Sequence, residues 1–527
     1  PPDFARLTQH SSDVAEACGA LARAVGRVAL ENAGIDPQHF GAFEVALRAT
    51  GWIEDIGKAN SHFHELVTGR DRVPQLLRHE TVSGLLMLRV PELREWLAPL
   101  DATLTTTIWG ALAHHRKFDD ERSLPIQSPA LTVFVSHPEF HELLAAMGSD
   151  LGLDAPPRFE RDLTIARDRA SGADIAAYPA LLALFDEFAD REPDYSEPTP
   201  RRTLALVKAF GIAADVAASA IAARGRHASR YSVARFVEDT LLGAGLSGQD
   251  VAGLIRAWAW RSRGDRAHGV SRTELPPQFE LRPFQRDVAA STSRVTLARA
   301  GCGSGKSLAA YLWAAEWQKR VEASGRPPLR LFVCLPTTGT TTEHFKDYAM
   351  ESGVDDIALV HSRASVDLET IAETFASEEA PDESATAAEQ RAASAAAARD
   401  KIESLALWST PLVVTTADTV LGLMANSRRA LYGFPAIALG AIVFDEVHAF
   451  DDELFGHLLV YLANFPKQPV LLMTASLPDH RLRAIRAVRP DLAVVDGPAD
   501  LEQLPRYRVV HAPDDSAVQR AIADTVD

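Results

Sequence analysis

Two short segments, about 140 residues apart, constrain this chain more than any other feature. The first is Ala300-Gly-Cys-Gly-Ser-Gly-Lys-Ser307, a glycine-rich loop closed by a lysine and a serine. The second is Asp445-Glu446-Val447-His448, which follows the apolar run Ala441-Ile-Val-Phe444. A glycine turn before an ordinary helix would explain the loop alone, but not the loop together with an acidic box at this spacing. The pair predicts an NTP-driven nucleic-acid motor.

The glycine-rich loop lies between a predicted strand, Val295 to Leu297, and a predicted helix that begins near Leu308. Glycines let successive backbone N–H groups turn toward one point, and these donors cradle phosphates together with the helix N-terminus. The lysine of such a loop reaches the outer phosphates, and the hydroxyl after it ligates magnesium. Contacts to ATP and Mg²⁺ are therefore predicted for Gly303, Gly305, Lys306 and Ser307.

The acidic box supplies the groups that complete an ATPase site. Asp445 follows a predicted buried strand, at the edge where ligands bind a parallel sheet, and is predicted to hold Mg²⁺ mostly through water. Glu446 is placed to orient or deprotonate the attacking water. Upstream of the loop, Leu281-Arg-Pro-Phe-Gln285 ends in a glutamine that is predicted to recognise adenine, Gln285.

Three further apolar runs end in hydroxyl side chains. Each is predicted to be a strand whose polar tip lies at one sheet edge, where such tips hold a phosphate backbone without reading bases. The runs are Phe332-Val-Cys-Leu-Pro336 with two threonines after it, Val413-Val-Thr-Thr416 and Leu471-Leu-Met-Thr-Ala-Ser476. In the order and spacing of these motifs, residues 281–480 resemble the first RecA-like domain of superfamily 2 helicases.

The N-terminal half carries a scattered set of histidines and carboxylates. A lone histidine in a helical chain is more often a surface or capped core residue than a ligand, but the set is harder to dismiss. Asp55 and Lys58 are three residues apart, on one helical face. Asp215 is a lone carboxylate in a helix of small residues, where a charge needs a partner such as a metal ion. Imidazoles and carboxylates suit Mn, Fe, Ni or Co, and two such ions promote displacement at phosphorus.

The order of these residues resembles the HD phosphohydrolase superfamily, and the HD-then-helicase order resembles the CRISPR-associated HD nuclease–helicase of type I systems. That family degrades DNA unwound by an RNA-guided complex. The resemblance implies that Asp55 bridges two metal ions and that Lys58 steadies the scissile phosphate or the leaving group. It also implies metal ligands on one ion at His79, His114 and His115, and on the other at His10 and Asp215.

One position departs from that family's pattern. The histidine of the pair that names the superfamily is Glu54 here. Glutamate can ligate a metal, so the site survives with an altered metal preference, or one ion is lost and the nuclease is weakened. His62 and His64 could substitute as ligands, although exposed helix positions are expected for both. The alternatives are a nuclease-attenuated translocase that keeps the HD fold as a scaffold, and an HD–helicase of another antiphage or DNA-processing pathway.

Composition fits a multidomain enzyme of the cytoplasm. The chain has 527 residues and 46% hydrophobic content, enough for several packed cores. Its three cysteines show no metal spacing, and neither a signal peptide nor a run of 18 apolar residues predicts membrane contact. The net charge of −17 is a weak argument against DNA, because local patches meet nucleic acid. Single-stranded DNA is the predicted substrate, and the resemblance implies an RNA-guided type I effector complex as partner.

The fold prediction is a multidomain chain in which an all-α domain precedes an α/β domain. Helical periodicity predicts an HD-type metal-dependent nuclease domain over residues 1–260, followed by a polar linker over 261–280. Alternating strands and helices predict a RecA-like domain with a parallel sheet over 281–505. Residues 506–527 are expected to begin a second RecA-like domain that is otherwise absent. ATP binding with weak or no turnover is expected for that reason.

Overall fold

The computed structural model describes most of both halves of the chain. The described residues are 6–68, 76–114, 129–168, 172–224, 232–243, 245–261, 274–276, 279–301, 303–337, 405, 407–498, 514–515 and 518–519. Among the predicted features, His115, most of the linker and most of residues 506–527 lie outside them.

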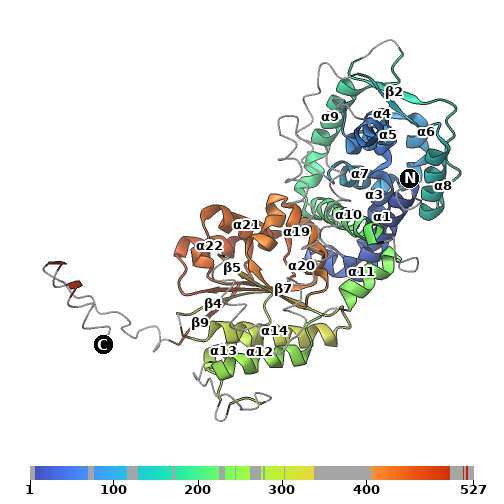
Figure 1. Cartoon of the computed structure of the whole chain (residues 1–527). Helices are drawn as coiled ribbons and strands as arrows, with labels where there is room; N and C mark the ends of the chain where they lie inside the picture. The colour runs from blue at the N-terminus through green and yellow to red at the C-terminus, as the bar shows by residue number, and fades with distance from the viewer. Residues whose placement is uncertain are drawn as a thin grey trace.

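The N-terminal half is built mostly from helices, and its long helix α10 lies on the side that faces the other half of the chain (Figure 1). Its longer helices are α1 (Leu7–Leu21), α3 (Phe40–Ile53), α4 (Ser61–Thr68), α5 (His79–Arg89), α7 (Asp101–Leu112), α8 (Pro138–Leu151), α9 (Ala177–Ser196), α10 (Pro198–Arg224), α11 (Val233–Leu242) and α12 (Gly248–Arg261). Shorter ones are η2 (Ala22–Gly26), α2 (Arg27–Asn32), η3 (Pro37–His39), α6 (Pro91–Trp96) and η5 (Ala98–Leu100).

Helix α10 packs on helices of both halves of the chain. It contacts α1, α3 and α7, so most of its surface faces other helices. Its segment Pro198–Ala220 is long and apolar enough to cross a membrane by composition, but 72% of the relevant stretch is buried inside the fold. Burial on all sides explains an apolar composition that shows little amphipathic pattern.

A small three-stranded sheet interrupts the helices. Strand β1 (Leu131–Val133) pairs antiparallel with β2 (Leu163–Ala166), and β2 pairs parallel with β3 (Ile175–Ala176). Only helices were predicted for this half, because strands this short carry too few residues for a clear alternation. The prediction of a helical half followed by a RecA-like domain is confirmed, with this sheet as an addition.

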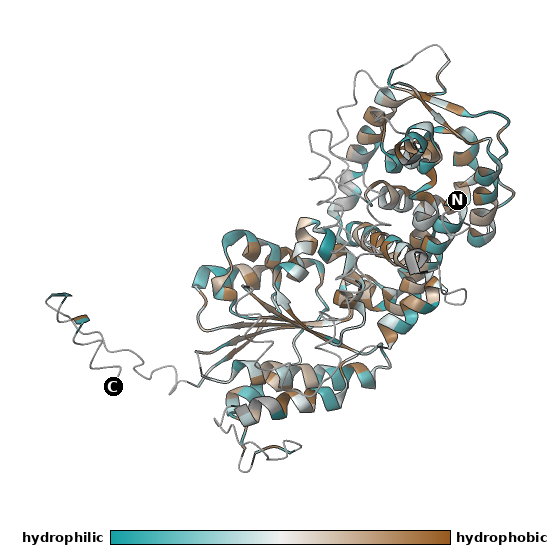
Figure 2. Cartoon of the chain, viewed as in Figure 1, coloured by the Kyte–Doolittle hydropathy of each residue, from teal (hydrophilic) through white to brown (hydrophobic). Residues whose placement is uncertain are grey.

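The C-terminal half contains a six-stranded sheet in the order β6-β5-β7-β8-β4-β9, in which every described pair is parallel. Figure 2 shows its strands as a hydrophobic layer between helices whose outer faces are more hydrophilic. The strands are β4 (Val295–Arg299), β5 (Arg330–Leu335), β6 (Leu412–Thr416), β7 (Gly440–Phe444), β8 (Val470–Thr474) and β9 (Ala493–Asp496).

Helices cover both faces of this sheet, which is why its strands are continuously apolar. On one face lie α12, α13 (Pro283–Ala290) and α14 (Lys306–Ala323) (Figure 1). On the other lie α18 (Asp418–Leu421), η8 (Gly422–Ala425), α19 (Arg428–Tyr432), α20 (Phe434–Ala438), α21 (Asp452–Asn464) and α22 (Asp479–Val488). Helix α12 precedes the predicted boundary at residue 260, yet it packs on α14. The predicted domain boundaries themselves stay a prediction.

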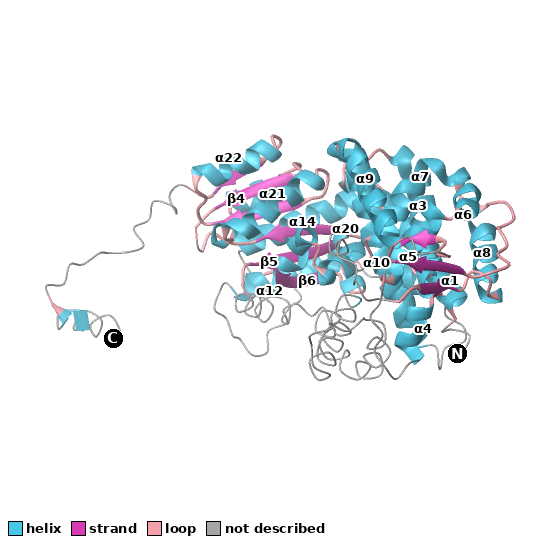
Figure 3. Cartoon of the chain, turned by 90° about the horizontal axis from the view of Figure 1, so that it is seen from above, coloured by secondary structure: helices cyan, strands magenta, loops and turns pink. Residues whose placement is uncertain are grey.

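The two halves lie side by side and share a hydrophobic core (Figures 1 and 3). One continuous cluster of buried residues includes Leu21 of α1 and Phe210 of α10 together with Phe332 of β5 and Phe434 of α20. The rings of Phe210 and Phe434 pack edge to face, with centroids 5.1 Å apart. The helical half therefore packs directly on the layer of helices that covers the sheet.

Candidate functional site

Asp55 lies at the centre of a cluster of histidines and carboxylates in the helical half. It follows α3 and precedes the short helix η4 (Ile56–Lys58). The packing of η4 on α5 fixes the backbone here, because the Gly57 N–H donates to Ser83 Oγ at 2.9 Å. Only glycine fits, since a Cβ at Gly57 would lie 2.0 Å from His79 O. The Asp55 carboxylate is thereby held next to the first residue of α5.

The first donor set consists of Asp55, His79 and His114, whose ligand atoms lie within 4.8 Å of one another. His79 Nε2 is 3.3 Å from Asp55 Oδ1, and His114 Nε2 is 4.0 Å from the same oxygen. The other imidazole nitrogens face acceptors: His114 Nδ1 lies 2.6 Å from Ala111 O, and His79 Nδ1 lies 3.4 Å from Glu80 Oε2. A proton on Nδ1 leaves Nε2 as an acceptor directed at Asp55, which is the tautomer that a metal ligand needs.

The second donor set consists of His10, Glu54 and Asp215, again with ligand atoms within 4.8 Å of one another. His10 comes from α1, Asp215 from α10, and Glu54 directly follows α3. His10 Nε2 lies 3.5 Å from Asp215 Oδ1 and 3.1 Å from Asp55 Oδ2. Asp55 therefore presents one oxygen to each donor set.

Glu54 is the residue that stands where the related superfamily has a histidine. Its side chain is fully buried, and neither carboxylate oxygen has a hydrogen-bond partner among the described residues. Burial raises the pKa of Glu54 well above its usual range, and the nearby carboxylates of Asp215 and Asp55 raise it further. A bound cation would relieve this repulsion, so the donor set fits a metal ion.

The charges around Asp55 favour its ionised form. Burial raises the pKa of Asp55, but the positive charge of Lys58 and the hydrogen bond from His10 outweigh burial and hold that pKa well below its usual range. Burial lowers the pKa of His10, because it disfavours the charged imidazolium. Hydrogen bonds to Asp215 and Asp55 outweigh burial and raise this pKa to about 10. Lys58 Nζ lies 2.7 Å from Asp55 Oδ2. The cluster thus combines a stable carboxylate with cations that balance it.

The two histidines considered as substitutes do not belong to either donor set. His64 is exposed, as expected. His62 is buried, so the expectation of an exposed position is wrong for it: its Nδ1 accepts a hydrogen bond from Leu76 N–H at 3.2 Å. This contact uses one ring nitrogen of His62 as an acceptor for the backbone just before α5.

The glycine-rich loop lies at the carboxyl edge of the six-stranded sheet, between β4 and α14. Gly303 and Gly305 have φ values of 79° and 88°, a left-handed conformation that side chains rarely adopt. Lys306 begins α14 and is buried, with its Nζ donating to Ala300 O at 2.8 Å. Ser307 follows in the first turn of the same helix. The loop geometry fits a phosphate-binding turn.

Gln285 and its neighbour Arg282 hold this loop from α13. Gln285 Nε2 donates to Gly305 O at 3.3 Å, and Arg282 Nη1 donates to Gly303 O at 2.6 Å. The side-chain oxygen Oε1 of Gln285 in turn accepts a hydrogen bond from the backbone N–H of Arg282 at 2.9 Å. Its role in adenine recognition stays a prediction, whereas its contact with the loop is direct.

The acidic box follows β7 at the same sheet edge. Burial raises the pKa of Asp445 to about 6, and the neighbouring Glu446 adds to this effect. Glu446 has a φ of 50°, which is uncommon for a residue with a side chain and marks a constrained position. His448 Nδ1 lies 3.2 Å from Glu446 Oε2 and 3.2 Å from Thr474 Oγ1 at the end of β8. The box is thus connected to the hydroxyl tip of the next strand.

Sequence reasoning missed several residues that position these groups. Glu80 is buried beside His79 and forms an ion pair with Arg78 at 2.7 Å. Its position directly after a predicted ligand could have indicated this role. Ser83 and Arg282 had no such signal, because their contacts depend on elements far apart in the chain meeting in space.

Comparison with known proteins adds a family to this geometry. Residues 282–485 match the DEAD/DEAH box helicase family. Over 529 residues the chain is 34% identical to a Myxococcus xanthus protein named CRISPR-associated nuclease/helicase Cas3, covering 96% of this chain and 62% of that protein. The chain is a homologue of CRISPR-associated nuclease/helicases. The predicted resemblance is therefore confirmed.

The present chain also matches nuclease/helicases to which it is less similar in sequence. A Methanocaldococcus jannaschii protein of the same name is 24% identical over 204 residues, or 38% of this chain and 25% of that protein. A crystal structure of T. fusca Cas3 with AMPPNP covers 92% of this chain and 50% of its own, at 17% identity and a TM-score of 0.49. The chain spans less than two thirds of the length of each of these relatives.

Proposed function

We propose that this chain joins an ATP-dependent DNA helicase or translocase to a metal-dependent HD nuclease, which degrades single-stranded target DNA in CRISPR interference. An RNA-guided effector complex is the proposed partner, and the cytoplasm the proposed location. The observation that carries the nuclease half is the position of Asp55, with one carboxylate oxygen toward each donor set. The family of the nuclease/helicase relatives supports the same assignment.

One or two ions of Mn, Fe, Ni or Co would be held by the two donor sets. His79 and His114 would hold one ion, and the second would be held by His10, Glu54 and Asp215, with Asp55 between the two. His115, a further proposed ligand, lies outside the described residues. When bound, such ions activate water and stabilise charge at phosphorus.

The chain's own residues have separate tasks in this proposal. Lys58 places an ammonium group beside Asp55, where it offsets the negative charge of a phosphodiester. The contact of His114 Nδ1 with Ala111 O fixes the imidazole ring, so its Nε2 keeps one orientation. The carboxylates of Glu54 and Asp55 are buried, which limits the access of water to them.

In the motor half, we propose that Gly303, Gly305, Lys306 and Ser307 bind the phosphates of ATP and its Mg²⁺, and that Asp445 holds that Mg²⁺. Glu446 would orient the attacking water, and Gln285 would contact adenine. Lys306→Ala should weaken ATP binding at least tenfold, because it removes the cation at the outer phosphates. Fluorescent-nucleotide titration measures this, and unchanged affinity would contradict the assignment.

Metal content and DNA cleavage test the nuclease proposal. Asp55→Ala should lose bound metal and single-stranded DNA cleavage in Mn²⁺, whereas Lys306→Ala should cleave like the unmodified chain without ATP. Asp168→Ala is the matched control, because this aspartate is exposed and pairs only with Arg167 among the described residues. Equal metal content in the Asp55→Ala and unmodified proteins would contradict the assignment of Asp55 as a metal ligand.

Glu54 supports a second candidate function, a translocase whose nuclease is attenuated. Burial and the neighbouring carboxylates of Asp215 and Asp55 raise the pKa of Glu54, and a protonated carboxyl is a poor metal ligand. Glu54→His separates the two candidates. Faster cleavage by this variant would favour attenuation, and slower cleavage would favour Glu54 as a working ligand.

A further inference from the structure

A cavity of about 160 Å³ lies at the amino edge of the six-stranded sheet, where the two halves of the chain meet. It is lined by Asn32 of α2, by Trp317 near the end of α14, and by the residues that precede or begin the strands, among them Arg294, Gly440 and Pro469. One water requires roughly 10–15 Å³ of such volume. The cavity therefore has room for a group larger than a single water. The glycine-rich loop lies at the opposite edge, about 15 Å away along a five-residue strand.

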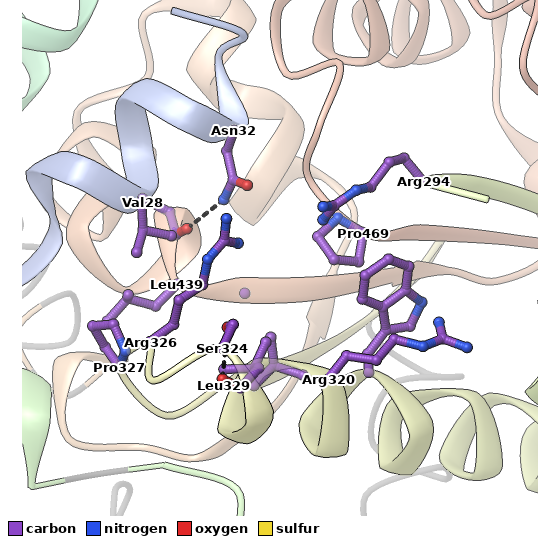
Figure 4. A pocket seen from close by; sticks show the side chains of 14 residues that line it. Val28, Asn32, Arg294, Arg320, Ser324, Arg326, Pro327, Leu329, Leu439 and Pro469 are labelled. Carbon is purple, nitrogen blue, oxygen red and sulfur yellow. Dashed lines mark hydrogen bonds between the residues drawn. The ribbon is translucent and has the colours of Figure 1, made fainter. Parts of the chain in front are cut away.

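The cavity is positively charged. Its lining includes Arg294, Arg320 and Arg326, and no carboxylate. Figure 4 shows the guanidinium ends of Arg294 and Arg326 turned toward the same space below Asn32, whereas that of Arg320 points away. Glu31, which is not part of the lining, pairs with Arg326. An unpaired positive charge in a hollow attracts an anion.

Arg294, like Arg320, has no ion-pair partner among the described residues, and only Arg294 of these two turns toward the cavity (Figure 4). The Arg294 guanidinium stacks over the Trp317 ring at 4.9 Å. Burial lowers the pKa of Arg294, and the positive charge of Arg326 lowers it further, against the opposing effect of Glu31. Two like charges that share a half-buried space are stabilised by an anion between them.

Asn32 adds an acceptor to these donors. Its side chain is 3% exposed, and its Nδ2 donates to Ala438 O at 2.9 Å. Its Oδ1 is buried without a hydrogen-bond partner among the described residues. Leaving such an atom unsatisfied costs on the order of 1–3 kcal/mol, so the cavity fits a ligand that both accepts and donates.

We propose that this cavity binds a phosphate group, either free phosphate or a terminal phosphate monoester. Phosphate oxygens would accept from Arg294 and Arg326, and a protonated phosphate oxygen would donate to Asn32 Oδ1. The bound group would connect α2 of the helical half with the sheet, because its contacts come from both. The site is independent of the ATP and metal sites described above.

The test uses the full chain carrying Lys306→Ala, in EDTA, so that neither the phosphate loop nor metal captures the anion. Inorganic phosphate is titrated by calorimetry and by the shift of the unfolding temperature, with sulfate as the ion that lacks an O–H donor at neutral pH. Phosphate should bind more tightly than sulfate and raise the unfolding temperature. Arg294→Gln should weaken phosphate binding at least tenfold, and Arg161→Gln, at an exposed pair with Asp174, should leave it unchanged.

Asn32→Asp guards against a folding defect in Arg294→Gln. The new carboxylate would lie beside the arginines and would give up the hydrogen bond from Asn32 Nδ2 to Ala438 O. This variant should still unfold in one cooperative transition, which shows that it is folded, and should lose phosphate binding. Oligonucleotides with a 5′-phosphate or a 5′-hydroxyl distinguish the sources: Arg294-dependent preference for the 5′-phosphate assigns a strand end, and binding of inorganic phosphate alone assigns the free ion. Phosphate binding that is absent, or equal in all variants, overturns the proposal.

Discussion

Glu54 is a buried acid whose charge is unfavourable in the protein without metal. Its carboxylate lies near those of Asp55 and Asp215 and lacks a hydrogen-bond partner among the described residues. Because the folded-state pKa is raised above the unfolded value, folding favours the protonated form. The associated stability is present at low pH and is lost as the pH rises past the usual range of a glutamate. A metal ion would reverse this, since it favours the ionised form.

Glu54→Gln is therefore expected to have opposite effects with and without metal. In EDTA at pH 8 it should raise the free energy of unfolding by on the order of 1–3 kcal/mol, because it removes an unpartnered buried charge. At pH 5.5 the gain should shrink, and in Mn²⁺ the variant should lose the metal-dependent stabilisation. Urea unfolding in the four conditions measures this. A variant less stable than the unmodified chain in EDTA at pH 8 would contradict the electrostatic account.

Asp445 predicts a pH dependence in the motor half. Its pKa of about 6 means that it loses its charge as the pH falls through 6, and a neutral carboxyl does not hold Mg²⁺. At pH 5.5 about a quarter of these groups stay ionised, so the Mg²⁺-dependent affinity for ATP should be roughly fourfold weaker than at pH 7.5. Nucleotide titrations with Asp445→Asn as the control measure the difference, because the titration of ATP itself is common to both proteins. An identical pH slope in the control would refute the prediction.

At the scale of elements, the contact of η4 with α5 determines where Asp55 and His79 lie. Gly57→Ala would place a Cβ 2.0 Å from His79 O, so the two elements must separate. The expected cost is about 1–3 kcal/mol of unfolding free energy, together with weaker metal binding. Gly41→Ala in α3 is the matched control, since its Cβ would meet nothing within 4 Å and alanine favours a helix. Equal stability and metal content in both variants would show that this contact does not position the cluster.

Some features of the fold and of the candidate site could be predicted from the sequence, and others could not. The glycine-rich loop and the acidic box were predicted correctly as strand-to-loop transitions, because their chemistry is written in consecutive residues. The scattered set from His10 to Asp215 was collected through a family resemblance, and the structure brings its described members together, although their roles stay predictions. The sheet β1–β3 and the burial of His62 were not predicted. They depend on contacts between distant segments, which local patterns do not contain.

At the scale of the whole molecule, one buried arginine connects the two halves. Arg330 begins β5 and is fully buried, and its Nη2 donates to Leu241 O of α11 at 2.8 Å and to Trp408 O. Burial lowers the pKa of Arg330 to about 10, so it remains charged at neutral pH. Together with the shared hydrophobic core, this contact makes the halves mechanically one unit.

The shared core predicts a single cooperative unfolding transition for the chain. Arg330→Met should lower the free energy of unfolding by at least about 2 kcal/mol, because the buried carbonyl groups of Leu241 and Trp408 lose their donor. Arg23→Met, at an exposed pair with Glu238, should change it by less than about 0.5 kcal/mol. Calorimetry with probes in both halves measures this. Two well-separated transitions would contradict the shared core.

The shared core also bears on how the protein is made. A chain is synthesised from its N-terminus, and domains generally fold as they emerge. Here the buried face of α1 is completed by α10 and α11, and its cluster extends as far as Ile485 of α22. The donor set of His10 and Glu54 likewise waits for Asp215. The nascent polypeptide must therefore shield an apolar surface through much of its translation, and its cluster of donors is completed only when α10 has left the ribosome.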